Sequence, residues 1–180
     1  TVSQYLEIPA GSYTLFLEPE DECLIEILIH GVVIAVRDGT QSEFQFTLSS
    51  LIPFGALDWR ATIATPNLLN IFMNPEFTET DWDDYQAGET YSITDQVWLL
   101  RKEFYVSSVP QSLGLYYQLQ GGMMVYLNGH LVFTLNMNED LSMQSVSNSQ
   151  STTLKIGRAV LTSSWLMENH QNVIAIAVSS

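Results

Sequence analysis

The chain contains two clusters of acidic side chains whose carboxylates could bind a metal ion. Glu18-Pro-Glu-Asp-Glu22 lies at an expected turn, and Asp81-Trp-Asp-Asp-Tyr85 lies in the middle of the chain. Calcium takes several oxygen ligands from a loop, and alternating carboxylates can supply them. Neither cluster fits the EF-hand pattern, because no Gly or closing Glu falls at the required place. Each cluster is therefore either a solvated turn or a calcium site, with Asp81, Asp83 and Asp84 as the expected metal ligands.

Aromatic and amide side chains near the second cluster suggest contact with an organic ligand. Sugars present apolar C–H faces and hydroxyl groups, so their sites combine aromatic rings with carboxylates or amides. Trp82 and Tyr85 provide rings within a polar segment, and Asn136 and Asn138 provide amides in a later loop. These four residues are the expected ligand contacts. The alternative for Trp82 is that its ring fills one end of the protein core.

The residues that most often carry catalysis form no recognisable motif here. His30 and His130 lie at expected turns, and neither they nor His170 have a second His or Cys at metal-ligand spacing. The sequence has no Gly-x-Ser-x-Gly elbow, no phosphate-binding glycine loop and no His-Glu-x-x-His helix. Paired catalytic carboxylates leave no linear signature. We expect a protein that is not an enzyme, although it could accompany a catalytic domain.

The charge balance excludes some partners. The chain has 180 residues, of which 20 are acidic and 6 basic, and its net charge is -14. Such a field repels phosphate backbones and anionic lipids, so we expect neither nucleic-acid binding nor attraction to anionic membranes. No apolar run is long enough to span a bilayer, so we expect no membrane insertion. The single cysteine, Cys23, excludes an intrachain disulfide and is expected to lie on a strand as a small core residue. The charge fits an extracellular or cell-surface protein, or one with a cation site or basic partner.

Hydrophobic periodicity predicts an all-β protein. Short runs rich in β-branched and aromatic residues alternate with turn signals, as in sandwiches and barrels. One or two helical turns are expected only at Leu161–Glu168. The expected strands are Gln4–Ile8, Ser12–Leu17, Cys23–Ile29, Val32–Arg37, Glu43–Leu48, Arg60–Ala64, Leu68–Met73, Val97–Val106, Leu113–Leu119, Met123–Leu127, Leu131–Leu135, Thr153–Ile156 and Asn172–Val178.

Asn128-Gly129 is the strongest turn signal, because both residues tolerate the positive φ of a tight type I′ hairpin. Ile29-His-Gly-Val-Val-Ile34 resembles Leu127-Asn-Gly-His-Leu-Val132, and Asn67–Phe72 resembles Asn172–Ala177. The chain could thus contain a duplication, although alternation alone can align two β-meanders. On this basis we expect an N-terminal β-sandwich at residues 1–73. An acidic linker or long loop at 74–96 and a second sandwich at 97–180, which could recruit 74–96, would follow.

Four segments of the second half resemble a known family. They are Trp98-Leu-Leu-Arg-Lys-Glu-Phe104, Gln120-Gly-Gly-Met-Met-Val-Tyr-Leu-Asn-Gly129, Thr134-Leu-Asn-Met-Asn138 and Gln171-Asn-Val-Ile-Ala-Ile-Ala-Val178. In their order and spacing they resemble the galactose-binding-domain-like modules of secreted and cell-surface proteins. The resemblance implies a jelly-roll-type antiparallel β-sandwich. Gln120-Gly121 replaces the family's acidic residues, and the strand that usually follows would come from elsewhere or from a longer chain.

The resemblance and the candidate residues together predict non-catalytic recognition. The expected ligand is a carbohydrate or glycoprotein, bound on loops at one end of the sandwich. Calcium is the candidate cofactor. Within the strand Val97–Val106, Trp98 and Phe104 should face the same layer, and Arg101 and Lys102 should pair with nearby carboxylates. The competing hypothesis is a structural repeat unit of a filament or surface layer that assembles through exposed sheet edges, or through neighbouring domains of a longer chain.

Overall fold

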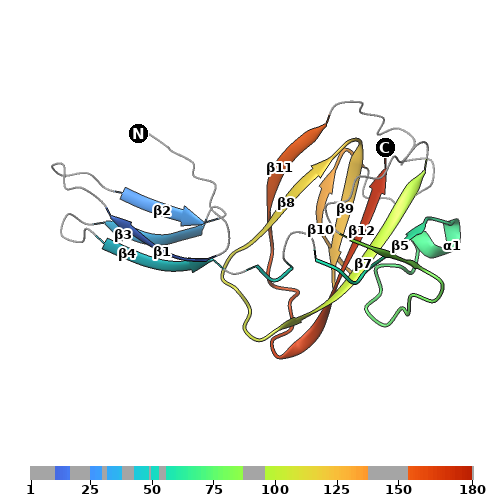
Figure 1. The fold of residues 1–180 in the computed structure, drawn as a ribbon, viewed down its shortest axis with the longest axis horizontal. Coiled ribbons are helices and arrows are strands. Elements are labelled where there is room, and N and C mark those ends of the chain that lie inside the picture. Colours follow the sequence, from blue (N-terminus) through green and yellow to red (C-terminus); the bar gives the residue numbers. More distant parts are fainter. Residues whose placement is uncertain are drawn as a thin grey trace. The chain divides into compact units, whose positions relative to one another are not determined.

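The structure, a computed structural model, shows an all-β protein (Figure 1). Every strand pair among the described residues is antiparallel, which confirms the predicted fold class. The chain divides into two compact units, Thr1–Leu51 and Ile52–Ser180, and each is described by itself. The described residues are 11–16, 25–29, 32–37, 43–48, 50–52, 56–86, 96–137 and 154–179.

The first unit contains two antiparallel strand pairs. Strand β1 pairs with β4, and β2 forms a hairpin with β3. Their bounds are β1 Gly11–Phe16, β2 Ile25–Ile29, β3 Val32–Arg37 and β4 Glu43–Leu48. These four strands confirm the predicted ones to within two residues. The strand expected at Gln4–Ile8, and the residues Cys23 and His30, lie outside the described residues.

The second unit is built on a six-stranded sheet in the order β10-β9-β12-β7-β5-β6. The bounds are β5 Trp59–Ile63, β6 Asp83–Tyr85, β7 Val97–Val106, β9 Gly122–Leu127, β10 His130–Leu135 and β12 His170–Ser179. The central strand β12 carries small residues on one face. One of them, Ala175, is paired with Arg101 of β7 on one side and with Tyr126 of β9 on the other. These small residues leave room for large side chains beside them and above them.

A second layer of two strands, β8 (Leu113–Leu119) and β11 (Lys155–Leu161), covers one face of this sheet. Phe133 of β10 lies opposite Val125, and its ring contacts Tyr117 of β8 with centroids 5.7 Å apart. The layers therefore form an antiparallel β-sandwich, consistent with the predicted fold. Strand β11 extends to Leu161, and turns follow it, so the helix expected at 161–168 is wrong.

The other face of the sheet is covered by residues 64–82, which we call the cap segment. Its buried residues Leu69, Phe72 and Trp82 share one core cluster with Leu99 and Tyr126 of the sheet. The cap contains α1 (Pro66–Leu69), where the sequence predicts a strand at Leu68–Met73. A helix forms here instead of a strand because Thr65 accepts a hydrogen bond from Leu68 N at 3.3 Å and proline occupies the first turn. These two signals start a helix whatever the apolar pattern beyond them.

The boundary between the units corrects the predicted domains. Strand β5 pairs with β7, and β6 pairs with β5, so residues on both sides of position 73 belong to one sheet. The first unit ends at Leu51, and the segment expected to be a linker, 74–96, contributes β6 and part of the cap. The predicted boundary is wrong because it follows a repeat in which Asn67–Phe72 was aligned with a strand, whereas α1 lies there.

The hairpin at Asn128-Gly129 is confirmed. Asn128 has φ 47° and Gly129 has φ 86°, the positive values that a type I′ turn requires. The turn joins β9 to β10 with Leu127 opposite His130. Asn128 N also donates to Val173 O at 2.9 Å, so the turn is tied to β12 as well as to its own strands.

Candidate functional site

Trp82, the first candidate for ligand contact, lies in the core. Its side chain is 6% exposed and belongs to the cluster beneath the cap segment. The indole ring packs against Phe77, with centroids 5.7 Å apart and planes 54° apart. In the structure the Trp82 ring therefore fills part of the core, as in the alternative to ligand contact given in the sequence analysis. The role of Trp82 in ligand binding stays a prediction, and its ring is buried.

Asp81, Asp83, Asp84 and Tyr85 do not converge on one point. Asp83 and Asp84 are consecutive on β6, so their side chains lie on opposite faces of that strand. Asp84 pairs with Arg60 of the neighbouring strand β5, while Tyr85 is half-buried opposite Trp59. Among the described residues, no three His, Cys, Asp or Glu side chains gather where they could hold a metal ion.

Asn136 has a role in a turn. It has a positive φ of 53°, and its Nδ2 donates to Gly121 O at 2.8 Å. The bond joins the ends of β9 and β10 that lie away from the Asn128 turn. Met137, the next residue, belongs to the core cluster that contains Trp82, so this loop closes over the same face as the cap. Asn138 lies outside the described residues.

Arg101 holds the cap segment to the sheet. It is fully buried, and its guanidinium donates to the Glu79 carboxylate and to the backbone carbonyls of Phe72, Asn74 (3.0 Å) and Phe77 (3.1 Å). The guanidinium also lies 5.5 Å from the centre of the Phe77 ring. A single side chain thus satisfies several cap carbonyls that no strand ladder reaches. The predicted pairing of Arg101 with a carboxylate is confirmed.

Lys102, the next residue on β7, points to the opposite face and confirms the same prediction. Its Nζ donates to Asp58 Oδ1 at 2.6 Å and to Leu57 O at 3.0 Å. Phe104 shares this face and is buried, and Trp98 shares it and is half-buried. The two cations of β7 therefore position the segments on either side of β5, so their role is structural.

Two asparagines join the hairpin turn to the loop that precedes β12. Asn172 is fully buried, and its Nδ2 donates to Met167 O and His170 O, both at 2.9 Å. Its Oδ1 accepts from Met167 N at 2.7 Å and from Asn128 Nδ2 at 2.8 Å. Asn128 in turn accepts from Val173 N at 2.8 Å. This asparagine pair fixes the backbone of residues 162–169, which we call the β11–β12 loop.

The β11–β12 loop presents a tryptophan that the sequence reasoning missed. Trp165 is 43% exposed, its carbonyl accepts from Asn128 Nδ2 at 2.6 Å, and its ring stacks on His130. The ring centroids are 3.4 Å apart and the planes differ by 9°. The argument applied to Trp82, an aromatic residue in a polar segment, would have selected Trp165 too.

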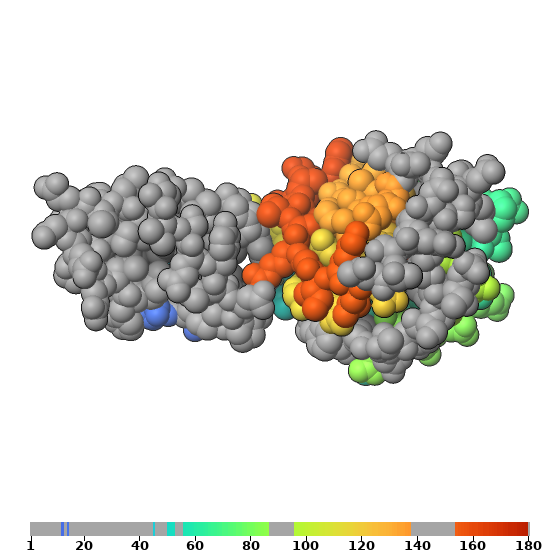
Figure 2. All heavy atoms as spheres, turned by 90° about the horizontal axis from the view of Figure 1, so that it is seen from above, coloured from blue at the N-terminus to red at the C-terminus, as the bar shows by residue number. Residues whose placement is uncertain are grey.

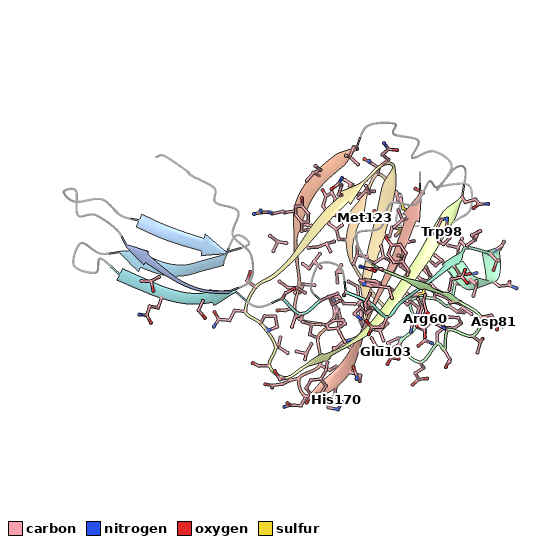
Figure 3. The ribbon with its side chains drawn as sticks, viewed as in Figure 1. Arg60, Asp81, Trp98, Glu103, Met123 and His170 are labelled. Carbon is pink, nitrogen blue, oxygen red and sulfur yellow. The ribbon has the colours of Figure 1, made fainter. Side chains whose placement is uncertain are left out.

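Exposed polar side chains complete this end of the unit. Glu168, Asn169 and His170 follow Trp165 in the chain, and all are exposed. His170 Nδ1 lies 2.7 Å from Glu168 O, and Asn169 has a positive φ of 56°. Figure 3 shows His170 at the lower end of unit 2, away from Arg60 and Asp81. The surface therefore combines a held aromatic ring with hydrogen-bonding groups, at a different place from the predicted cluster.

Comparison with known proteins assigns no family. No protein-family model matches the chain, and no curated protein matches it in sequence. Among the described residues, the helix is too short and too polar to cross a membrane.

Proposed function

We propose that this protein is a non-catalytic recognition module that binds carbohydrate, as part of a secreted or cell-surface protein. The observation that carries the proposal is Trp165, a half-exposed indole on a loop whose backbone is held by hydrogen bonds from the side chains of Asn128 and Asn172. An aromatic ring held in advance loses little conformational entropy when a sugar stacks on it. The indole ring can therefore serve as a stacking surface for the apolar face of a saccharide.

The geometry around Trp165 suits a polar ligand with apolar faces. The His130 ring stacks on one face of the indole, which favours this orientation of the Trp165 side chain. The remaining exposed surface can meet the C–H face of a sugar. The exposed side chains of Glu168, Asn169 and His170 in the same segment can exchange hydrogen bonds with its hydroxyl groups.

The family resemblance supports the same end of the sandwich. Galactose-binding-domain-like modules are expected to bind ligands on loops at one end, and the β11–β12 loop is such a loop. The segments that carry the resemblance contribute Asn128 and Asn172, the pair that fixes this loop. The ligand contacts predicted from the sequence, Trp82, Tyr85, Asn136 and Asn138, stay predictions.

A glycan array followed by titration calorimetry tests the proposal. We expect the full chain to bind at least one glycan and Trp165→Ala to bind it at least about tenfold more weakly, the effect of losing about 1.4 kcal/mol. Ile63→Ala is the matched control, because Ile63 is 44% exposed on β5 and pairs with Trp98, at the end of β7 away from His170, so it should not affect binding. Melting curves show whether each variant is folded.

Two outcomes would redirect the proposal. If Trp82→Phe, which keeps an aromatic ring in the core, abolishes glycan binding while Trp165→Ala does not, the site lies near the cap segment. If no glycan binds the folded chain, carbohydrate recognition is wrong.

A further inference from the structure

The segments around Trp165 contain no lysine or arginine. These segments are the β11–β12 loop, the hairpin turn at 128–130 and the first residues of β12. Five of the six basic residues of the chain belong to unit 2, and three of these five form ion pairs elsewhere. The pairs are Arg60 with Asp84, Arg101 with Glu79 and Lys102 with Asp58. These three cations are therefore engaged away from the Trp165 surface.

The two remaining basic residues, Lys155 and Arg158, belong to β11 and not to the loop that follows it. They lie about 20 Å and about 10 Å along an extended strand from Leu161, where β11 ends. Figure 2, which views the unit from above, shows side chains of β11 in orange-red at the surface, whereas Figure 3 places His170 at the lower end of the unit. A carboxylate on a ligand at Trp165 therefore finds no lysine or arginine in the segments around that ring.

The charged side chain of the β11–β12 loop is the carboxylate of Glu168. It is exposed and lies three residues after Trp165. The ion pairs of the described residues all involve other carboxylates, so no described cation neutralises Glu168. The chain as a whole adds to this negative field, because its net charge is -14.

The hydrogen-bonding groups beside Glu168 also favour a ligand that can donate. His170 Nδ1 lies 2.7 Å from Glu168 O, and a carbonyl oxygen only accepts, so Nδ1 carries a proton. In a neutral imidazole the other nitrogen, Nε2, is then an acceptor. The Glu168 carboxylate and His170 Nε2 both accept hydrogen bonds. They suit the hydroxyl groups of a sugar, whereas an ionised carboxyl group has no hydrogen to donate to them.

We propose that Glu168 makes the Trp165 surface selective against acidic sugars, so that the site binds neutral glycans and discriminates against those that carry a carboxylate. This inference rests on the proposed function, to which it adds a class of ligand and the residue that determines it. The Trp165 ring provides the stacking surface for either kind of sugar, and the Glu168 charge decides between them.

Titration calorimetry at about pH 8, above the usual range of histidine titration, tests the proposal with three forms of one glycan. The forms are a neutral glycan that binds the full chain, the same glycan with its terminal hexose oxidised to a uronic acid, and the amide of that uronic acid. The acid and the amide have nearly the same shape and differ in charge. We expect the acid to bind at least about fivefold more weakly than the amide, the effect of one like charge at about 4 Å in water. The difference should shrink in about 0.5 M NaCl, where the screening length is about 4 Å.

Two variants show whether Glu168 causes this difference. Glu168→Gln keeps the length of the side chain and removes its charge, so the acid should bind within about twofold of the amide. Thr80→Lys is the matched control, because it changes the net charge by the same amount at an exposed position next to Asp81, which Figure 3 shows away from His170. It should leave the difference as in the unmodified chain. Melting curves show whether each variant is folded.

The outcomes separate this inference from the proposed function. If the neutral glycan binds and the acid binds as tightly as the amide, selectivity against acidic sugars is wrong, while carbohydrate recognition stands. A difference that survives Glu168→Gln, or that Thr80→Lys reduces equally, overturns the role of Glu168. If no glycan binds the folded chain, the proposed function is wrong and this inference is wrong with it.

Discussion

Replacing Arg101 by methionine should lower the free energy of unfolding of unit 2 by about 3–5 kcal/mol. This is the cost of breaking a buried ion pair by removing one partner. Arg101 is fully buried, and Glu79, which would keep its charge, is only 15% exposed. The carbonyls of Phe72 and Phe77 also lose the guanidinium as donor, whereas Asn74 O keeps its bond from Phe77 N at 3.0 Å. Each carbonyl left dry costs about 1–3 kcal/mol, but the cap segment can shift and hydrate them, so these costs do not add in full.

Two further variants separate charge from geometry. Arg101→Lys keeps the positive charge but not the planar fork, so it can reach one or two of the acceptors and should lose less stability than methionine. Adding Glu79→Gln to Arg101→Met removes the carboxylate that the methionine variant leaves unpaired. The double variant should therefore be more stable than Arg101→Met alone.

Tryptophan fluorescence during denaturant unfolding measures this effect in the full chain. All four tryptophans (Trp59, Trp82, Trp98 and Trp165) belong to unit 2, so the signal reports on that unit alone. Trp82 is buried beneath the cap, and its emission should shift to longer wavelength if the cap loosens. A loss below about 1 kcal/mol, within the range of a neutral hydrogen bond, would refute the view that Arg101 holds the cap.

Three other predictions use the same unfolding measurement. Asn172→Ala should cost about 2–4 kcal/mol, because the fully buried Asn172 side chain makes four hydrogen bonds that are lost, whereas Asn128→Gly keeps the positive-φ turn and should cost less. Burial raises the pKa of Tyr126 from 10.0 to about 12. The unfolded chain then loses this proton first, so stability should fall by up to about 2–3 kcal/mol between those pH values, a loss that Tyr126→Phe should lack. Gly122→Ala should destabilise by about 1–3 kcal/mol, since its Cβ would lie 2.7 Å from Met137 Cγ.

Local features of the fold could be predicted from the sequence, because their causes are local. The positive φ values of Asn128 and Gly129 follow from the residue types, and the alternation on β7 places Phe104 and Lys102 on one face. The sequence also predicts that Arg101 finds a carboxylate. It does not identify Glu79, which lies 22 residues away, because that choice depends on how the cap folds over the sheet.

The candidate site was harder to predict from the sequence, because it depends on contacts between segments that are far apart in the chain. Trp82 stands between aspartates, whereas Trp165 stands between Ser164 and Leu166. The polarity of these neighbours would favour exposure of Trp82 rather than of Trp165, the reverse of what the structure shows. Burial of Trp82 depends on Phe77 and on the strands beneath the cap. Exposure of Trp165 depends on Asn128, in a hairpin 37 residues earlier, whose side chain holds the loop backbone.

The two hairpins share an irregularity that alternation does not explain. In β2–β3, Leu28 pairs with Val33 and Ile27 with Ala35, so Ile34 is the extra residue of a bulge. In β9–β10, Tyr126 pairs with Leu131 and Val125 with Phe133, so Val132 is the extra residue. Ile34 and Val132 are also equivalent in the sequence alignment. Since bulges are individual features of a strand, this match favours a duplication of the hairpin.

The order in which the strands pair also matches between the two units, but only for the strands next to the hairpin. In each unit the strand before the hairpin pairs antiparallel with the strand after it, as β1 with β4 and β8 with β11. The match ends there, because β5, the cap segment, β7 and β12 have no counterpart among the described strands of the first unit. These are the elements that supply Arg101 and Asn172, the side chains that hold the cap and the β11–β12 loop. If the hairpins are copies, the first unit repeats the scaffold, and the Trp165 surface depends on elements particular to the second.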